Sequence, residues 1–288
     1  MAVSAQSTSP EKLSLAVQNA HPRDARIIFI ADDHTYWLDG VNRFPISVSG
    51  VWQTFFDKFD AERTVDMYYI HWSRKEASPY HALIHSLREE GKTDAEIKTS
   101  IIASWNMTGQ TASREGTIMH REIEYRLNYN HGDDYTYAGT PEMIQFGKFM
   151  EEFATPRGWK TYRTEWSIYD EKRMIAGQID CVFHCQETGE YHMVDWKRSQ
   201  KILDPKIGEQ YGRRGLPPCH FMIDNPFSNY AAQQNLYAVM LLDNYDLRIS
   251  TMWLVQLHPL QKNFKAHRVP PFFPAARHML DRCASTAK

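Results

Sequence analysis

Residues 161–197 read TYRTEWSIYDEKRMIAGQIDCVFHCQETGEYHMVDWK, and this stretch decides the fold. β-Branched and aromatic residues fill three runs, at 161–169, 174–183 and 191–196. Turn residues separate these runs at 170–172 and at 187–189. Runs of this composition and length, joined by short turns, are typical of neighbouring strands. The stretch therefore predicts a three-stranded meander within a central sheet.

Two acids in this stretch, Asp180 and Asp195, each follow an apolar residue at or near the end of a predicted strand. Because the turn at 187–189 folds the two strands side by side, we expect both carboxylates at one edge of the sheet. Two such carboxylates repel each other unless a cation lies between them, and Mg²⁺ prefers oxygen ligands. The period of two in a strand places Lys197 on the same face as Asp195 and turns the Trp196 side chain toward the core. A lysine at this point can orient or deprotonate an attacking water and offset phosphate charge.

The chain before the meander is predicted to be mostly helical. A turn at Asp32–His34 separates two short strands, and Ser49 is the expected N-cap of a helix that begins near Gly50. Thr93 and Glu96 form a capping box that opens a further helix. The expected elements are strands at 26–30 and 35–38 and helices over much of 50–155, among them 110–129 and 141–154.

A segment that contains several glycines and prolines, 199–227, follows the meander, and loops of this length are usually functional or mobile. Beyond it, the pattern predicts a helix at 230–242, strands at 248–257 and 263–269, and a last helix at 274–283. The fold class is therefore α/β, with a central mixed sheet flanked by helices and a helical N-terminal half. We expect a flexible leader at 1–24 and one domain at 25–288, in which 50–110 forms a helical cap or insertion and 199–227 a substrate-side loop.

Composition limits the class of protein. The chain has 288 residues, 42% of them hydrophobic, and a formal net charge of −2, which excludes a globally basic DNA-coating protein but allows a local basic groove. No apolar run is long enough to span a membrane, and no basic-then-apolar leader indicates secretion, so we expect an intracellular protein in the nucleus or cytoplasm. Four cysteines in a chain of this length do not indicate a disulfide framework.

Two pairs of polar residues stand four positions apart in predicted helices, so the members of each pair share a helix face. His120 and Glu124 form the first pair, and Gln233 and Tyr237 form the second, which can reach a phosphate or the metal site. Glu124 has an equally weighted alternative as a solvated helix residue.

Glu165 is a further acid in the first strand of the meander, near the same sheet as the two aspartates. Its alternative role is an ion pair across the sheet with Arg163 or Lys172.

Basic residues gather after the meander. Between Trp196 and Arg214 there are six Lys or Arg against two acids, which leaves a local charge of +4 in a chain that is nearly neutral. This charge suits a loop that tracks phosphates beside an acidic metal site, and the alternative is a solvated loop. The basic residues expected to contact nucleic acid are Arg198, Lys201, Lys206, Arg213 and Arg214.

The order of these motifs resembles the RecB-like nucleases of the PD-(D/E)XK superfamily. The family order is G-x-x-x-H on a helix, a strand with G-x-I-D, then V-D-W-K, then Q-x-x-x-Y on a helix. The corresponding segments here are Gly116–His120, Gly177–Asp180, Val194–Lys197 and Gln233–Tyr237, within residues 46–257. The long loop before Gln233 and the Leu257-His258-Pro259 sequence are also similar to nuclease-like proteins of large DNA viruses and mobile elements.

The resemblance implies a restriction-endonuclease-like core and phosphodiester hydrolysis of DNA that depends on Mg²⁺ or Mn²⁺. By this resemblance His120, Asp180 and Asp195 are metal ligands, with the Trp196 carbonyl and Glu124 as further candidates. Lys197 is the catalytic lysine, and Glu165, Gln233 and Tyr237 support the catalytic site. Some members carry a four-cysteine iron–sulfur cluster, but here no cysteine precedes the His120 helix, so no cluster is expected.

The expected activity is that of an exonuclease on single-stranded DNA or duplex ends. The alternative from another class is a nucleic-acid-binding module without activity. A third possibility is a subunit of a recombination, replication or transposition machine that requires partner proteins. The sequence leaves open the polarity, endonuclease activity, preference for DNA or RNA, one metal or two, and the oligomeric state.

Overall fold

A computed structural model describes residues 13–129, 139–199, 209 and 212–286. The chain divides into two compact units. The first consists of the residues up to Phe56 together with those from Ile118 onward, and the second is Asp57–Thr117. The second unit thus interrupts the first along the sequence and overlaps most of the region, 50–110, where a helical cap or insertion was expected.

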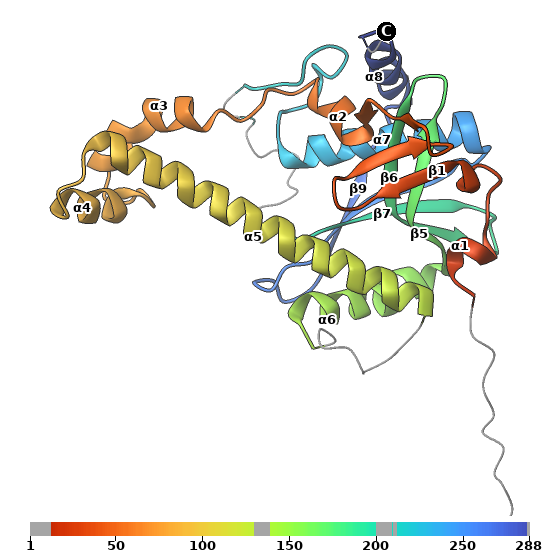
Figure 1. Cartoon of the computed structure of the whole chain (residues 1–288). Helices are drawn as coiled ribbons and strands as arrows, with labels where there is room; N and C mark the ends of the chain where they lie inside the picture. The colour runs from red at the N-terminus through yellow and green to blue at the C-terminus, as the bar shows by residue number, and fades with distance from the viewer. Residues whose placement is uncertain (1–12, 130–138, 200–208, 210–211, 287–288) are drawn as a thin grey trace, which may run out of the picture. The chain divides into compact units, whose positions relative to one another are not determined.

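A six-stranded mixed sheet forms the centre of the first unit (Figure 1). Three of its strands follow one another in the sequence and pair antiparallel with their neighbours, so the predicted meander is confirmed. The following strand lies parallel to the third strand of the meander, and the last one is antiparallel at the edge. The strands of this sheet are β4 (Ile46–Ser47), β5 (Trp159–Asp170), β6 (Ile175–Cys185), β7 (Tyr191–Lys197), β8 (Ile249–Gln256) and β9 (Lys265–Val269).

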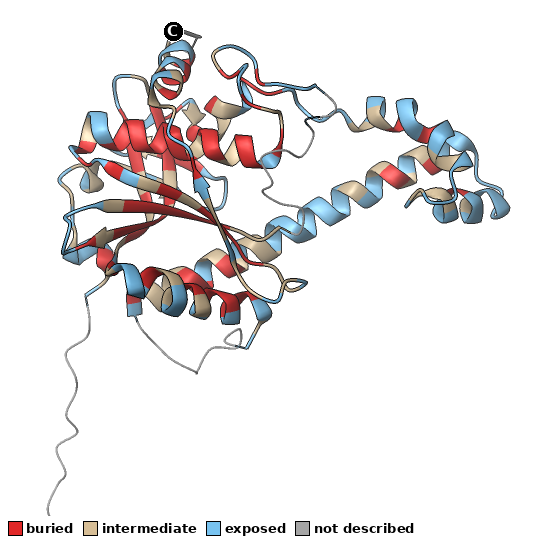
Figure 2. Cartoon of the chain, turned by 180° about the vertical axis from the view of Figure 1, so that it is seen from behind, coloured by how far each residue is buried: buried red, intermediate tan, exposed pale blue. Residues whose placement is uncertain are grey.

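Helices cover both faces of this sheet (Figures 1 and 2). On one face, α2 (Val48–Gln53), α7 (Pro226–Tyr245) and α8 (Phe273–Thr286) share a hydrophobic core with the strands. On the other face, α6 (Pro141–Lys148) and the C-terminal part of α5 (Asp94–Tyr129) pack against residues of β6 and β7, including Trp196. These layers confirm an α/β fold with a mixed sheet flanked by helices. Among the described residues, no helix has the length and apolarity needed to cross a membrane.

Strand β6 has a forked edge, which positions the site described below. Its edge away from β5 pairs with β4 at Ile175–Ala176 and with β7 at Cys181–His184. Gly177–Asp180 therefore has no strand partner on that edge within the described chain. The Tyr237 ring fills the space beside Gly177, where an added Cβ would lie 2.8 Å from Tyr237 Cε1. Glycine at position 177 thus permits the close approach of α7.

The N-terminal segment of the first unit packs against the rest of that unit. A short helix, α1 (Leu15–Gln18), precedes a three-stranded sheet of β1 (Ile27–Ile30), β2 (Thr35–Leu38) and β3 (Asn42–Arg43), in which β1 and β2 are the two predicted strands. The Leu15 N–H donates to Asn128 Oδ1 at 3.0 Å, and Asp24 accepts from the Trp166 indole at 2.9 Å. Within the expected leader at 1–24, the structure therefore holds Leu15 and Asp24 against the protein.

The second unit is a small helical assembly. It contains α3 (Ala61–Arg74), α4 (His81–Glu89) and the first part of α5, around a core of Val65, Tyr69, Ile84, Ile97 and Ile101. The Thr93–Glu96 capping box is confirmed, since Glu96 N–H donates to Thr93 Oγ1 and Thr93 N–H donates to Glu96 Oε2.

Two sequence predictions about helices need correction, and a third is correct in its bounds. One continuous helix of 36 residues, α5, replaces the separate helix expected at 110–129. Ser47, not Ser49, caps α2, because the Ser47 hydroxyl accepts from Gly50 N–H at 3.2 Å. The helix that begins at Pro141 continues beyond α6 as a π-helical turn, Phe149–Ala154, so its predicted end near 154 is correct although its winding changes.

Candidate metal and catalytic site

Three possible metal ligands converge beside the fork of β6. They are His120 from α5, Glu165 from β5 and Asp180 from β6, and their donor atoms all lie within 4.8 Å of one another. His120 Nδ1 is 3.6 Å from Glu165 Oε1 and 3.5 Å from Asp180 Oδ2. All three side chains are partly buried, between 13% and 25% exposed. The arrangement joins one ring nitrogen to two carboxylates from separate elements.

The backbone carbonyl of Trp196 fixes the orientation of the His120 ring. Nε2 lies 2.9 Å from this oxygen, and because a carbonyl can only accept, Nε2 must carry the hydrogen. In a neutral imidazole the lone pair then sits on Nδ1 and faces the two carboxylates. A carbonyl that holds one ring nitrogen in this way orients the other for a metal. The sequence predicted this carbonyl as a ligand, but the structure pairs it with the histidine.

Three acceptors that face one another need a positive charge between them, and either a proton or a metal ion can supply it. Burial disfavours the imidazolium form of His120, but the charges of Asp180 and Glu165 outweigh it and raise the pKa of His120 to about 9. A set of one imidazole nitrogen and two carboxylate oxygens suits divalent ions such as Mg²⁺ and Mn²⁺. The residues present therefore fit the implied metal.

Asp180 has a second role in the fold. Its Oδ2 accepts from the Trp196 N–H at 2.9 Å, directly beyond the last β6–β7 pair, Cys181 with Val194. The carboxylate thus takes the place of a strand partner where β6 and β7 separate. Asp180 lies in the middle of β6, not at or near a strand end as predicted, and this correction follows from the length of β6.

Asp195 and Lys197 form an ion pair next to this group. Lys197 Nζ lies 2.6 Å from Asp195 Oδ2, which confirms that the two side chains share a face. Burial, with the charge of Asp180, raises the pKa of Asp195 above its usual value, and the charge of Lys197 opposes this rise. Burial disfavours the charged form of Lys197, but Asp195 and Asp180 raise its pKa above the usual value. A lysine held in this way is a cation at neutral pH, suited to orient water and to offset negative charge on a phosphate.

Asp195 is not part of the three-residue group, although the sequence predicted it as a metal ligand. Glu124 is not part of it either, but it lies near: burial, and then the charge of Glu165, raises the pKa of Glu124. This proximity favours a place at the edge of the site over the alternative of a solvated helix residue.

Gln233 and Tyr237 share one face of α7, as predicted. Gln233 Nε2 lies 3.4 Å from Tyr237 Oη and 3.4 Å from Ser49 Oγ. Burial raises the pKa of Tyr237 well above its usual value, and Tyr36, Asp180 and Asp195 also raise it. The pair therefore lines the fork beside the acids.

Glu165 has an unusual backbone for a strand residue. Its φ of +42° lies in the left-handed region, which costs a non-glycine residue of order 1–3 kcal/mol. Arg163, one of the two partners that the alternative offered for Glu165, is instead paired with Asp24 at 2.7 Å. The Glu165 carboxylate thus faces His120.

Sequence reasoning missed two residues near this site. Tyr36, on β2, is 3% exposed. Burial raises the pKa of Tyr36, and the nearby charges of Glu165 and Asp180 raise it further. Gln178 Nε2 donates to the Glu165 carbonyl at 3.0 Å. Neither belongs to a motif, and the contact of Tyr36 depends on a hairpin that is distant in the sequence. The period of two along β6 places Gln178 on the face of Asp180, which was the one available signal.

The basic residues expected to contact nucleic acid differ in their surroundings. Arg198 Nε lies 2.7 Å from Glu142 Oε1, and both side chains are largely buried, so this arginine is anchored to α6. Its contact with nucleic acid stays a prediction. Arg213 pairs with Asp224 at 2.7 Å but remains 51% exposed. Arg214 donates to the Phe221 carbonyl at 3.3 Å. Lys201 and Lys206 lie outside the described residues.

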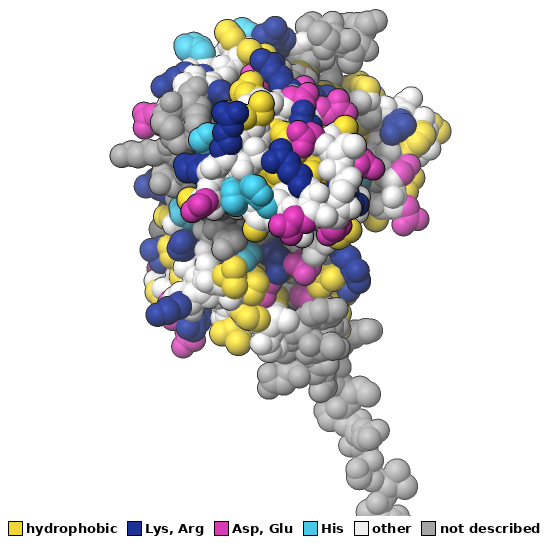
Figure 3. Space-filling view, turned by 90° about the vertical axis from the view of Figure 1, so that its left-hand side faces the viewer, with side chains coloured by type: hydrophobic (Ala, Val, Ile, Leu, Met, Phe, Trp, Pro, Cys, Tyr) yellow, Lys and Arg dark blue, Asp and Glu magenta, His cyan; other side chains and the backbone are white. Residues whose placement is uncertain are grey.

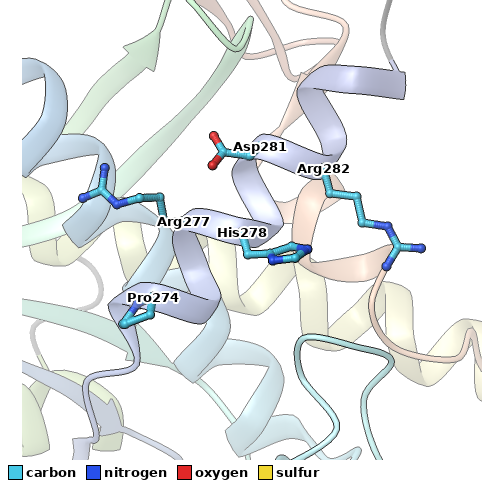
Figure 4. Close-up of a pocket in the computed structure, with 5 residues that line it drawn as sticks. All are labelled: Pro274, Arg277, His278, Asp281 and Arg282. Carbon is cyan, nitrogen blue, oxygen red and sulfur yellow. The ribbon is translucent and has the colours of Figure 1, made fainter.

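Charge is mixed on the face shown in Figure 3, where basic and acidic side chains are interspersed. A shallow pocket of about 550 Å³ on α8 is equally mixed (Figure 4). Two of its lining residues already have partners elsewhere: Arg277 pairs with Asp243, and Asp281 with Arg173 at 2.7 Å. This pocket contains none of the predicted site residues, and its charged groups do not converge.

Comparisons with known proteins add little. No family model matches the chain, and no curated protein matches it. Twelve chains among the solved structures match. One is described as "Crystal structure of SSO0001", with 13% identity and a TM-score of 0.27 over 51% of this chain. The match spans 59% of that chain.

Proposed function

We propose that this chain is a Mg²⁺- or Mn²⁺-dependent deoxyribonuclease of the RecB-like type that hydrolyses phosphodiester bonds at DNA ends or in single strands. The observation that carries the proposal is the convergence of His120, Glu165 and Asp180 beside the Asp195–Lys197 pair. A ligand group for a divalent cation, from α5, β5 and β6, thus lies beside a buried lysine cation on β7. This combination is suited to a phosphate diester, whose hydrolysis requires charge stabilisation and an oriented water.

The topology supports the finer assignment to the PD-(D/E)XK superfamily. The meander of β5, β6 and β7 carries Glu165, Asp180 and the Asp195–Lys197 pair in turn, and helices cover both faces of the sheet. The four motifs occur on the elements that the resemblance requires, with His120 on α5 and Tyr237 on α7.

Each residue has a distinct role in the proposed site. His120, Glu165 and Asp180 would hold the metal ion, which lowers the pKa of a bound water and withdraws charge from the phosphate. The Trp196 carbonyl keeps His120 in the tautomer that ligation needs. Asp195 holds Lys197 in place, and the Lys197 ammonium orients water and stabilises the charge that develops on phosphate oxygens.

The test is cleavage of end-labelled linear single- and double-stranded DNA with Mg²⁺, Mn²⁺ or EDTA. We expect metal-dependent cleavage by the wild type and a loss of about 10²–10⁴-fold in Lys197→Ala, the range for a lost acid–base or charge-stabilising group. Lys160→Ala is the matched control, because Lys160 bonds only an exposed Gln186 side chain in the described structure, at 2.7 Å. The product ladder shows whether degradation begins at an end.

Absence of cleavage by the wild type would contradict the stand-alone enzyme. DNA binding without cleavage would then favour a silent module or a subunit that requires a recombination or replication partner. Equal cleavage by wild type and Lys197→Ala would remove the lysine from the mechanism.

A further inference from the structure

The Glu165 backbone is held in a conformation that a strand does not provide. The β5–β6 ladder pairs Thr164 with Cys181 and Trp166 with Ile179, which places Glu165 opposite Asp180 without a pair of its own. The φ of Glu165 is +42°, whereas extended strands have strongly negative φ. Such conformations persist only where the surroundings determine them, and they cluster at functional sites.

The Gln178 side chain makes a hydrogen bond that can hold the Glu165 backbone in this conformation. Its Nε2 donates to the Glu165 carbonyl at 3.0 Å, across from the neighbouring strand. Gln178 is two residues before Asp180 on β6, so both side chains point to the same face of the sheet. The hydrogen bond therefore joins β6, the strand that carries Asp180, to the backbone of Glu165, whose φ is positive.

We infer that Gln178 is a positioning residue that holds the turned Glu165 peptide and thereby keeps the Glu165 carboxylate within the metal-binding group. The inference rests on the metal site of the proposed function but not on the identity of the substrate. Without this hydrogen bond, the peptide relaxes toward an extended conformation and the carboxylate moves away from His120 Nδ1, from which it is now 3.6 Å.

The test measures Mn²⁺ binding by isothermal titration calorimetry and electron paramagnetic resonance, without DNA. Gln178→Met keeps the length of the side chain and removes the donor. We expect its Mn²⁺ affinity to fall about 10- to 100-fold, the usual effect of losing a group that orients a metal ligand. Gln186→Met is the matched control, since Gln186 lies just beyond β6 and bonds only Lys160 in the described structure.

A double-mutant cycle separates positioning from a general structural role. If Gln178 acts through the Glu165 carboxylate, Gln178→Met has no further effect on Mn²⁺ affinity in a Glu165→Ala background. Thermal unfolding in EDTA reports the fold separately, and we expect the midpoint of Gln178→Met within a few degrees of the wild type.

The outcomes are distinct. An unchanged affinity in Gln178→Met overturns the inference and leaves the proposed nuclease intact. An equal loss in both backgrounds also overturns it, because Gln178 would then act by a route that does not involve Glu165. A wild type that binds no Mn²⁺ overturns the proposed metal site and this inference together.

Discussion

The fork of β6 and the middle of α5 differ in what stabilises the backbone: contacts between distant segments at the fork, and local helical hydrogen bonds in α5. At the fork, groups from several elements hold one another: the Trp196 N–H donates to Asp180, and the Trp196 carbonyl accepts from His120. In α5, all side chains at 106–114 are exposed, and an added Cβ at Gly109 would meet nothing within 4 Å. The fork depends on each side chain it contains, whereas this stretch of helix depends on its own backbone hydrogen bonds and on residue propensity.

The largest expected effect comes from the charge of Asp180. Asp180→Asn keeps an oxygen that accepts from Trp196 N–H but removes a charged ligand, so we expect Mn²⁺ affinity to fall by about 10²-fold or more with a small change in thermal midpoint. Asp180→Ala also leaves that N–H without its acceptor and costs a further ~1–3 kcal/mol in the free energy of unfolding. Calorimetry and thermal unfolding measure the two effects.

The matched control is Asp66→Asn in the second unit, where Asp66 is 67% exposed and pairs with Lys98. We expect a change of less than ~1 kcal/mol there, because exposed ion pairs contribute little. Similar losses of stability in Asp180→Asn and Asp180→Ala would show that the bond to Trp196 requires the charge.

Gly177→Ala tests the tight packing of the fork. The new Cβ would lie 2.8 Å from Tyr237 Cε1 and 3.1 Å from Val48 Cβ, so we expect a loss of about 1–3 kcal/mol in the free energy of unfolding. Urea unfolding measures it. Adding Tyr237→Ala should make Gly177→Ala less costly than it is alone, and strict additivity of the two losses would contradict the contact.

The pH dependence of stability tests the electrostatics of the fork. Without metal, His120 has a pKa of about 9 in the folded chain, above its ordinary value of 6.5. A raised pKa stabilises the fold fully below pH 6.5, and this contribution is lost as the pH rises through 9. In EDTA we expect the thermal midpoint to fall over this window, by roughly 2–4 °C for each ~1 kcal/mol of this contribution that is lost.

His120→Asn is the comparison variant, and its fall over the same window should be smaller. The same proton must leave when a metal binds, so calorimetry in buffers of different ionisation enthalpy should show proton release in the wild type and less in His120→Asn. Equal profiles for the two proteins would place the titration elsewhere.

The smallest expected effect is in the middle of α5. Because its Cβ would meet nothing within 4 Å, Gly109→Ala should stabilise the helix by about 0.5–1 kcal/mol through backbone entropy and propensity. Hydrogen exchange of the amides at 106–114 measures this as slower exchange. The same substitution thus stabilises one region and destabilises the other. Faster exchange in Gly109→Ala would contradict the description of 106–114 as a helical stretch without packing partners in the described structure.

The sequence was most informative where a local pattern determines the structure. The meander follows from alternation between turns, the Thr93 capping box from two side chains, and the shared face of Asp195 and Lys197 from the period of a strand. Each of these depends on residues within a few positions of one another.

Contacts between distant segments were not predictable in this way. The pairing of β4 with β6 creates the fork, and the hairpin brings Tyr36 near the acids, but neither leaves a local pattern. The positive φ at position 165 could not be predicted, because the residue there is glutamate and not the glycine that usually indicates such a conformation. Arg198 was assigned to nucleic acid from local charge alone, while its partner Glu142 lies 56 positions earlier.

Trp196 serves the site only through its backbone, while its side chain, 1% exposed, packs against Phe146 and Phe149. The Trp196 backbone thus contacts the site residues, while the Trp196 side chain contributes only to the core. Any large apolar side chain that fills the same space leaves the N–H and the carbonyl where they are. Among descendants of this chain, we expect position 196 to drift among bulky apolar residues while its two neighbours stay fixed.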